Sequence, residues 1–264
     1  MAKIGLLAGE GSLPIVFSRY AKAKGDVVIA FGLKGITSPE LEANVAKMHW
    51  LEWKDLKKAL MLLAMERLGK IVMLGKIKKE DILKDASKIG GKTADMLKDK
   101  KDYAILNEAA KLLSKIGIQV MDSTTYLKEL MPSKGTLTRR EPTAKEWEDI
   151  DYGRDVAKAM AGFDIGQTVV VKDKAVIALE SAEGTDETIK RAGILAKDGF
   201  VVVKVARPNQ DMRFDVPLVG ISTVQTVIDS GGKVLAIESD KMLMMDKDES
   251  VKLADENGLS MLAI

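Results

Sequence analysis

The fold is decided near the start of the chain, where an apolar run leads directly into a glycine-rich turn: Lys3-Ile4-Gly5-Leu6-Leu7-Ala8-Gly9-Glu10-Gly11-Ser12-Leu13-Pro14. Residues 3–8 are typical of a short buried strand, and residues 15–24 carry apolar side chains at helical spacing. Between them, Gly9 and Gly11 allow positive φ angles or a close approach of two backbones, and Ser12 can cap the helix. A strand, a glycine turn and a helix in this order predict the beginning of a doubly wound α/β sheet.

The alternation of strands and helices continues beyond this turn. We expect further strands at residues 27–31, 45–51, 70–74 and 118–121. Helices are expected at residues 56–68, between residues 79 and 115, and at residues 124–130. Strands that alternate with helices predict a parallel sheet covered on both faces, so residues 1–131 are interpreted as a doubly wound, Rossmann-like domain.

The polar stretch of residues 132–145 interrupts this pattern and is interpreted as a linker. Beyond it, strands are expected at residues 168–172, 175–181, 200–206 and 234–239, with Asp173-Lys174 as a tight turn between the first two. Helices are expected at residues 146–161, 187–196, 222–230 and 249–257. We interpret residues 146–264 as a second α/β domain with a mixed sheet, so the fold class of both halves is α/β.

The composition excludes several classes of protein and site. The chain has 264 residues and a net charge of +2, whereas dedicated nucleic-acid-binding domains are usually much more basic, so no nucleic-acid partner is expected. It contains no cysteine, which excludes thiolate catalysis and cysteine-bound zinc, and its sole histidine, His49, excludes a polyhistidine metal site. The sequence shows no signal-peptide pattern and no apolar run near the roughly 20 residues that span a bilayer, so we expect a cytoplasmic protein.

The glycine turn lies where a doubly wound sheet binds phosphate, because exposed N–H groups and the helix dipole attract an anion there. The candidate binding residues are Gly9, Gly11, Ser12 and Leu13, and the alternative is a tight turn without a ligand. A dinucleotide site is disfavoured. Pro14 takes the place of the third glycine of the G-x-G-x-x-G fingerprint, and the second strand ends without an acid that could hold a ribose.

Two further motifs directly follow predicted strands. Gly75 and Lys76 come after the fourth strand, at the same edge as the glycine turn, where Lys76 could meet a phosphate or simply belong to a solvated run of charge. In the second half, a strand is followed by Glu183-Gly184-Thr185-Asp186. Thr185 or Asp186 could cap the next helix, but a cap explains neither Glu180 nor Glu183.

The segment from Lys204 to Pro217 carries the strongest signal. Lys204 interrupts an otherwise apolar strand, and a buried lysine needs a partner; an edge strand that exposes it is the alternative. Asp211, Arg213 and Asp215 then alternate with apolar residues, which would place them on one face of an extended segment. Cations suit phosphate oxygens, and carboxylates suit a divalent metal or an attacking water, although a surface strand with paired charges would have the same pattern.

Several elements in order along the chain together resemble a known family. They are residues 8–14, 132–137, 151–153, 164–171, 183–186, 213–220 and 223–224. On these elements, which extend over nearly the whole chain, the sequence resembles the UDP-2,3-diacylglucosamine pyrophosphatases of the LpxI type, which act in bacterial lipid A synthesis. One departure concerns the Arg-Pro that usually follows the glycine matching Gly75, because this chain has Lys78-Lys79-Glu80 there. Lysine keeps the charge but not the bidentate grip on phosphate.

The resemblance implies an activity and a division of labour. The family hydrolyses UDP-2,3-diacylglucosamine to lipid X and UMP, with water attacking the β-phosphorus and Mg²⁺ required. Residues 1–131 would bind the UDP part of this acylated UDP-sugar, and residues 146–264 would bind lipid X. The family's essential aspartate falls on Asp215, and family members are homodimers. The lipid substrate would also allow a peripheral contact with the inner membrane.

These implications give each candidate residue a role. Asp215 would bind magnesium or orient the water, with Asp211 and Glu183 as supporting metal ligands. Arg213 and Lys204 would neutralise charge on the transferring phosphorus. The remaining substrate contacts are expected at Gln167, Gly184, Thr185, Asp186, Gln210 and Thr223. Two alternatives stay open: a nucleotide-sugar transferase that uses the same phosphate site, and a non-catalytic sensor of a nucleotide or lipid.

Overall fold

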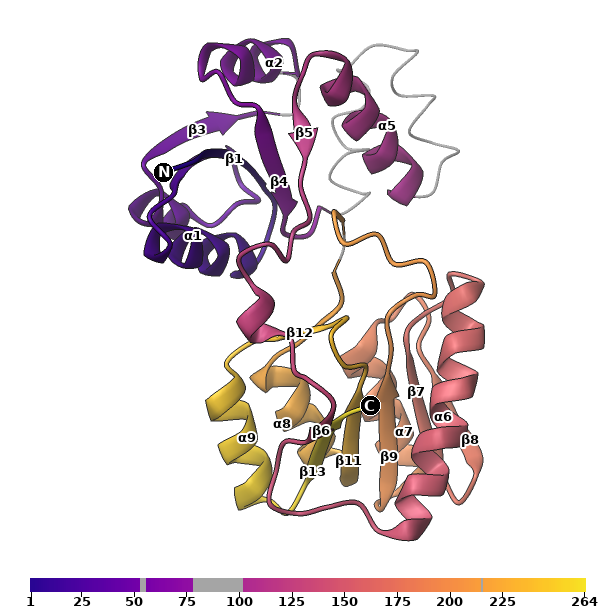
Figure 1. Cartoon of the computed structure of the whole chain (residues 1–264). Helices are drawn as coiled ribbons and strands as arrows, with labels where there is room; N and C mark the ends of the chain where they lie inside the picture. Colours follow the sequence, from indigo (N-terminus) through magenta and orange to yellow (C-terminus); the bar gives the residue numbers. More distant parts are fainter. Residues whose placement is uncertain (53–55, 78–101, 215) are drawn as a thin grey trace. The chain divides into compact units, whose positions relative to one another are not determined.

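A computed structural model describes residues 1–52, 56–77, 102–214 and 216–264. The chain divides into two compact units, each of which contains residues from both halves of the sequence (Figure 1). The first unit consists of Met1–Leu127 together with Asp211–Asp215, and the second consists of Lys128–Gln210 together with Val216–Ile264. Most of the helical region expected between residues 79 and 115, the Lys78-Lys79-Glu80 departure and Asp215 lie outside the described residues.

The first unit contains a parallel sheet. Its strands are β1 (Lys3–Ala8), β2 (Val27–Leu33), β3 (Lys47–Leu51), β4 (Lys70–Leu74) and β5 (Gln119–Val120). They lie in the order β3-β2-β1-β4-β5, and all four pairings are parallel. The described helices of this unit are α1 (Leu13–Ala23), the 3-10 helix η1 (Pro39–Asn44), α2 (Leu56–Met65) and α5 (Asp102–Lys115). The strand order reverses between β1 and β4, which confirms the predicted doubly wound fold.

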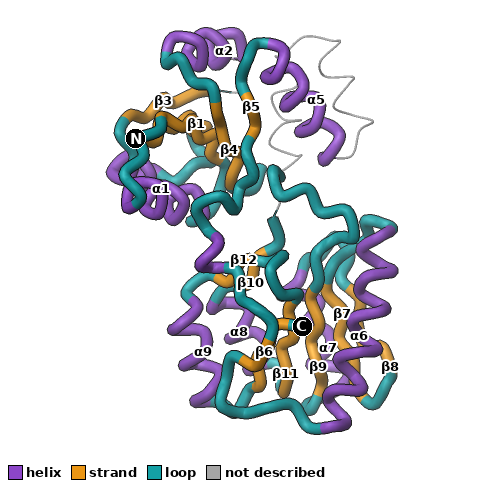
Figure 2. The backbone as a smooth tube through the Cα atoms, in the orientation of Figure 1, coloured by secondary structure: helices purple, strands orange, loops and turns teal. Residues whose placement is uncertain are grey.

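The second unit contains a mixed sheet, also as predicted. Its strands are β6 (Gly135–Thr136), β7 (Thr168–Lys172), β8 (Ala175–Leu179), β9 (Phe200–Lys204), β11 (Gly232–Ile237) and β13 (Ser260–Ala263). They lie in the order β6-β13-β11-β9-β7-β8. Neighbours among β13, β11 and β9 pair in parallel, and the pairs β6–β13, β9–β7 and β7–β8 are antiparallel. Figure 2 shows β11, β9, β7 and β8 side by side. A separate parallel pair joins β10 (Leu218–Val219) to β12 (Leu243–Met244).

Helices cover both faces of this mixed sheet. They are α6 (Ala144–Gly162), α7 (Thr185–Ala196), α8 (Ile221–Asp229) and α9 (Lys247–Glu256). The helix α6 packs on one face, where Gly153 lets it approach closely: a Cβ at Gly153 would lie 2.8 Å from a methyl group of Val203. The other three helices bury apolar side chains against the opposite face. The valine-rich strand β9 is therefore buried on both sides, as its uniformly apolar sequence indicates.

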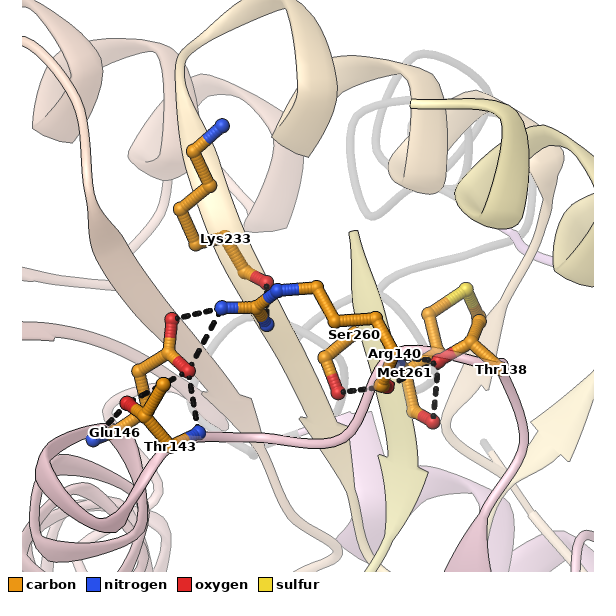
Figure 3. Close-up of polar contacts among 7 residues, drawn as sticks. All are labelled: Thr138, Arg140, Thr143, Glu146, Lys233, Ser260 and Met261. Atoms are coloured by element: carbon orange, nitrogen blue, oxygen red, sulfur yellow. Dashed lines mark hydrogen bonds and ion pairs between the residues drawn. The ribbon is translucent and has the colours of Figure 1, made fainter. Parts of the chain in front are cut away.

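The stretch 132–145, interpreted from sequence as a linker, forms part of the second unit. It contributes the edge strand β6 and the first residues of α6. Figure 3 shows how Arg140 holds it: the guanidinium bonds the Glu146 carboxylate at 2.6 and 2.9 Å, and the Arg140 carbonyl accepts a bond from the Ser260 hydroxyl at 2.8 Å. Thr143 and Glu146 form a reciprocal capping box at the start of α6. These contacts explain why a polar stretch is packed against the sheet.

Two turn expectations had different outcomes. The Asp173-Lys174 turn is confirmed, with positive φ angles of 53° and 59° at its two residues. The helix expected at residues 124–130 is wrong, because only Lys128–Leu130 form a 3-10 helix, η3. The Asp122 carboxylate accepts bonds from the Thr124 N–H at 2.7 Å and from the Thr124 hydroxyl at 2.6 Å. Such side-chain bonds to nearby backbone favour a turn over a helix.

Candidate functional site

In the first unit, the site lies where the strand order reverses. Gly9 follows β1 and Gly75 follows β4, and the two backbones are in contact: a Cβ at Gly75 would lie 2.7 Å from the carbonyl carbon of Gly9. The Gly9 N–H donates to the Leu74 carbonyl at 2.8 Å, and Glu10 and Lys76 exchange two backbone bonds beyond it. This edge of a doubly wound sheet is the place where such folds bind ligands.

The glycine turn leads into the N-terminus of α1 at this edge. Gly11 has a φ angle of +102° and, like Ser12, is exposed. Leu13 is buried and begins the helix. Ser12 is the N-cap residue, but within the described chain its side chain makes no capping hydrogen bond, so the expected side-chain cap is wrong. The first N–H groups of a helix have no intrahelical partner, which leaves this turn suited to an anion.

Residues 211–214 also belong to the first unit, although in sequence they lie between β9 and β10 of the second unit. The Ser123 N–H donates to the Met212 carbonyl at 2.8 Å. The Ser123 hydroxyl lies 2.9 Å from the Arg213 carbonyl oxygen and 3.0 Å from that of Met73, the penultimate residue of β4. The Arg213 backbone is therefore fixed at the same edge of the sheet as the glycine turn.

The Arg213 side chain is oriented by neighbours on several sides. Its Nε lies 3.0 Å and its Nη2 2.7 Å from the two carboxylate oxygens of Asp211, and Nη2 lies 3.3 Å from Oδ1 of Asn107 on α5. Its guanidinium lies 4.9 Å from the centre of the Phe214 ring. The expectation of an extended segment is wrong, because residues 211–214 form a turn that is closed by a bond from the Phe214 N–H to the Asp211 carbonyl at 3.0 Å.

In the second unit, Lys204 is the centre of a polar cluster. It ends β9, a central strand, and is only 9% exposed, so the alternative of an exposed edge strand is wrong. Its Nζ donates to the Thr185 hydroxyl at 2.6 Å, and that hydroxyl donates to Glu180 at 2.9 Å. Thr168, directly opposite Lys204 on β7, lies 3.4 Å from the same Thr185 oxygen. The cluster thus joins a buried cation, two hydroxyls and a carboxylate.

Glu180 is held from its other side, because its second carboxylate oxygen accepts a bond from the backbone N–H of Gln167 at 3.1 Å. Thr185 consequently does not cap α7, whose N-cap is Gly184 with a φ angle of 84°. Asp186 does not cap it either and instead accepts a bond from Thr223 on α8 at 2.8 Å. These bonds connect the beginnings of α7 and α8 to the carboxyl end of β9.

Glu183 takes part in an exposed ion pair. Its carboxylate lies 2.7 Å from the guanidinium of Arg191, which lies on α7. A bond from its own backbone N–H, followed in size by the bond from Arg191, lowers the pKa of Glu183 below its ordinary value. Gln210, another candidate, forms a local turn in which its side-chain oxygen accepts from the Arg207 N–H at 3.4 Å.

The structure therefore divides the candidate residues between the two units. The first unit holds Gly9, Gly11, Ser12, Leu13, Gly75, Lys76, Asp211 and Arg213. The second unit holds Gln167, Glu183, Gly184, Thr185, Asp186, Lys204, Gln210 and Thr223. The first set gathers at the switch point of a parallel sheet, and most of the second set gathers at the carboxyl end of β9.

Comparison with known proteins divides the chain by sequence, and residues 211–214 fall in the C-terminal match although they belong to the first unit. Residues 3–130 match the family model of the LpxI N-terminal domain, and residues 133–262 match that of the LpxI C-terminal domain. The chain belongs to the LpxI family. The resemblance inferred from sequence is thereby confirmed. One relative within this family is the UDP-2,3-diacylglucosamine pyrophosphatase LpxI of Caulobacter vibrioides (strain ATCC 19089 / CIP 103742 / CB 15), which is 26% identical over 277 residues, an alignment that covers 100% of this chain and 98% of the relative.

Solved structures outside the LpxI family give only distant likenesses. N5-carboxyaminoimidazole synthetase from Staphylococcus aureus matches with a TM-score of 0.24 and 16% identity, over 69% of this chain and 41% of that one. The biotin carboxylase domain of Hydrogenobacter thermophilus 2-oxoglutarate carboxylase matches with a TM-score of 0.28 and 12% identity, over 73% and 41% of the two chains. At these scores neither likeness bears on the fold or the function.

The residues described for this LpxI family member do not fit a preformed magnesium site. Among them, no group of three or more His, Asp or Glu side chains could hold a metal ion together. Both carboxylate oxygens of Asp211 are bonded by Arg213, and Glu183 is bonded by Arg191. Asp211 and Glu183 also belong to different units. As metal ligands, both would have to share their carboxylates with the arginines that bond them.

Sequence reasoning missed several polar residues at these two edges. Ser123 follows the strand predicted at residues 118–121, so the logic that selected Glu183 could have found it. Glu238 lies inside the strand predicted at residues 234–239, where a charged residue in an apolar run is the same signal that selected Lys204. Glu238, just beyond β11, accepts bonds from Lys158 at 2.5 Å, from Lys241 at 3.0 Å and from the Ala206 N–H at 2.8 Å. Burial acts to raise the pKa of Glu238, but these bonds together lower it. Asn107 lies within a helix and no sequence signal marks it.

None of the described helices combines the length and the apolar composition that crossing a bilayer requires.

Proposed function

We propose that this chain is a hydrolase that cleaves the pyrophosphate of UDP-2,3-diacylglucosamine to lipid X and UMP. In this reaction, a water oxygen forms a bond to the β-phosphorus and the bond from that phosphorus to the bridging oxygen breaks. UMP leaves with the bridging oxygen, and the water proton passes to a base or to solvent. The observation that carries the proposal is that both halves of the chain match the LpxI family, which includes a full-length relative named for this activity.

The geometry of the first unit supports a role in binding the nucleotide diphosphate. The helix N-terminus after Gly11 provides N–H groups for phosphate oxygens. Arg213 lies at the same edge, and its planar fork is held in place by Asp211. An arginine oriented before the substrate arrives can stabilise charge that develops on the phosphorus without further reorganisation.

The geometry of the second unit supports a role in binding the sugar phosphate. Lys204 supplies a buried positive charge, and Thr185 and Thr168 supply hydroxyl groups beside it. A phosphate placed there would meet a cation in surroundings that exclude most water, where electrostatic interactions are stronger than at the surface. Asp215 is assigned as the group that binds magnesium or orients the attacking water, on the sequence match of its motif alone.

Magnesium is included in the proposal as the cofactor. When bound to a diphosphate, Mg²⁺ would neutralise phosphate charge, and it commonly keeps several waters and takes one or two carboxylates. Asp215 is its proposed protein contact, on the sequence match of its motif. Removal of divalent cations with EDTA is expected to abolish UMP release, and added Mg²⁺ is expected to restore it.

The first test follows the fate of the water oxygen in the full-length protein. Hydrolysis of UDP-2,3-diacylglucosamine in ¹⁸O-labelled water should place the label in lipid X and leave UMP unlabelled, which mass spectrometry of both products distinguishes. Asp215→Ala should lower the rate at least about 100-fold, whereas the control Asp229→Ala, in an exposed acid at the end of α8, should leave it unchanged.

The outcomes separate the proposal from its rivals. Label in UMP would contradict attack at the β-phosphorus while leaving hydrolysis intact. Products that form only with an added acceptor would indicate a nucleotide-sugar transferase. A thermal shift with ligand but no UMP, even at high protein concentration, would indicate a non-catalytic sensor. The homodimer, the cytoplasmic location and the peripheral membrane contact that accompany this function stay predictions, and light scattering on the purified protein checks the first.

A further inference from the structure

Ser123 is a buried residue to which none of the roles described above is assigned. It lies just beyond β5 in the first unit and is only 1% exposed. It contacts the chain 90 residues further along, at the segment that carries Arg213. Its hydrogen bonds therefore connect two segments of the first unit that are far apart in sequence.

Ser123 holds the backbone rather than the side chains of that segment. Its N–H donates to the Met212 carbonyl at 2.8 Å, and its hydroxyl lies 2.9 Å from the Arg213 carbonyl oxygen. The same hydroxyl lies 3.0 Å from the carbonyl oxygen of Met73 on β4, so its single proton is shared between two acceptors. Ser123 thus ties two consecutive peptide groups to the carboxyl end of β4.

The residues around this tie leave Arg213 little freedom. Phe214 is 2% exposed and packs into the core of the first unit, which anchors the far side of the turn. Asp211 and Asn107 bond the guanidinium itself. Side-chain partners orient the arginine, and Ser123 connects the carbonyls of Met212 and Arg213 to the sheet.

We propose that Ser123 is a positioning residue that acts through Arg213: it fixes the turn of residues 211–214 at the edge of the sheet that carries the glycine turn. The inference rests on the proposed function, because it assigns Arg213 to the phosphorus that reacts. Catalytic groups must be held close to their productive geometry, and displacement by about 1 Å can cost two orders of magnitude in rate. A hydroxyl that anchors the backbone is one way to achieve this.

A matched control lies in the second unit. Ser260 is also fully buried, and its hydroxyl donates to a backbone carbonyl 120 residues away, that of Arg140, at 2.8 Å (Figure 3). Ser260→Ala and Ser123→Ala therefore remove the same group from equally buried sites. Both should lower the melting temperature, because each removes a hydroxyl that donates to a backbone carbonyl. The Arg140 carbonyl keeps a second bond, from the Thr138 hydroxyl at 3.1 Å.

The test compares these variants in the full-length protein by amide hydrogen exchange and by kinetics. Ser123→Ala should raise exchange selectively in a peptide that covers residues 211–214, whereas Ser260→Ala should leave that peptide unchanged. Ser123→Ala should also lower kcat for UMP release about tenfold with KM changed less than about twofold. In an Arg213→Ala background, the same substitution should lower kcat by no more than about twofold, because the group that it positions is gone.

Each result decides the inference separately from the proposed function. Unchanged exchange at residues 211–214 in Ser123→Ala would overturn the anchoring, even in a protein with no activity. Increased exchange with an unchanged kcat would overturn the link to catalysis while the hydrolase function stands. Equal losses of kcat with and without Arg213 would show that Ser123 acts as a general structural residue. Absence of UMP release in the unmodified protein would instead remove the proposed function.

Discussion

At the scale of single residues, the sole histidine is explained by a partly buried acid, Glu66. Glu66 follows α2, and its carboxylate bonds Lys47 at 2.5 Å, Lys3 at 2.9 Å and Nε2 of His49 at 2.9 Å. His49 is also stacked on Phe31, with ring centres 5.1 Å apart. The bonds from Lys47, Lys3 and His49, in order of decreasing effect, lower the pKa of Glu66 to about 2. His49 therefore has a structural role in the first unit.

Glu66→Gln should consequently destabilise the protein in a manner that depends on pH. The folded-state pKa of Glu66 lies below its ordinary value of 4.5, so its contribution is complete above about pH 4.5 and is lost as the pH falls towards about 2. Solvent screens these contacts, so we expect a loss of about 1–2 kcal/mol at pH 7. Urea unfolding across this pH range measures it.

Exposed Glu187, which pairs with Lys190 at 2.7 Å on α7, provides the matched control. Glu187→Gln should change the free energy of unfolding by less than about 0.5 kcal/mol at any pH. A difference between wild type and Glu66→Gln that stays constant from pH 7 to pH 2 would contradict the ionic origin of the effect.

At the scale of elements, the contact between the turns after β1 and β4 demands glycine at two positions. Gly75 has a φ angle of +93°, and a Cβ there would also lie 2.8 Å from the Glu10 carbonyl oxygen. Real Cβ atoms do not approach a backbone so closely, so the two turns would have to separate. Separation would open the edge at which the switch point lies.

Gly75→Ala should therefore cost at least about 3 kcal/mol of unfolding free energy, from a strained φ angle and a steric clash together. Gly117 is the matched control, since its φ angle of +81° is similar but a Cβ there would meet no atom within 4 Å. Gly117→Ala should cost only about 1–2 kcal/mol. Equal costs in chemical denaturation would show that the close approach contributes nothing.

Most elements could be predicted because their signals are local. The strands of both units follow apolar runs such as residues 3–8 and 200–204, and the Asp173-Lys174 turn follows from residues that tolerate positive φ angles. The turn at residues 211–214 could not be predicted, because alternating charged and apolar residues fit a strand equally well. What decides it is a bond from the Arg213 N–H to the Asp211 carboxylate at 3.0 Å and the burial of Phe214 in the first unit.

The candidate residues, like the elements, could be predicted where their signals are local in the sequence. The glycine turn and Thr185 follow predicted strands, and Lys204 interrupts one; the structure brings Nζ of Lys204 to 2.6 Å from the Thr185 hydroxyl. The arginine partners of Asp211 and Glu183 depend on side-chain geometry, which no spacing rule supplies. Ser123 depends on a contact across 90 residues, which a single sequence does not reveal.

At the scale of the whole molecule, the boundary between the units is crossed more than once. The chain changes unit after Leu127, and residues 211–214 return to the first unit. Phe214 joins a core cluster that includes Ile71 of β4 and Leu113 of α5. The first unit therefore depends on a side chain that the second half of the chain supplies.

Phe214→Ala should destabilise the first unit and spare the second. Loss of a fully buried phenylalanine costs about 3–5 kcal/mol. Amide hydrogen exchange should accordingly become faster in β1 and β4, while β9 and β11, which flank residue 214 in sequence, keep their protection. Faster exchange confined to β9 and β11 would show that Phe214 stabilises the second unit and not the first.

The late position of Phe214 has a consequence for biosynthesis. When residues 1–127 leave the ribosome, the phenylalanine that completes their core has not yet been translated. The first half of the nascent chain therefore cannot reach its final packing until most of the second half has been synthesised, even though domains commonly fold in the order of their synthesis. The first half therefore completes its folding only after Phe214 has been synthesised.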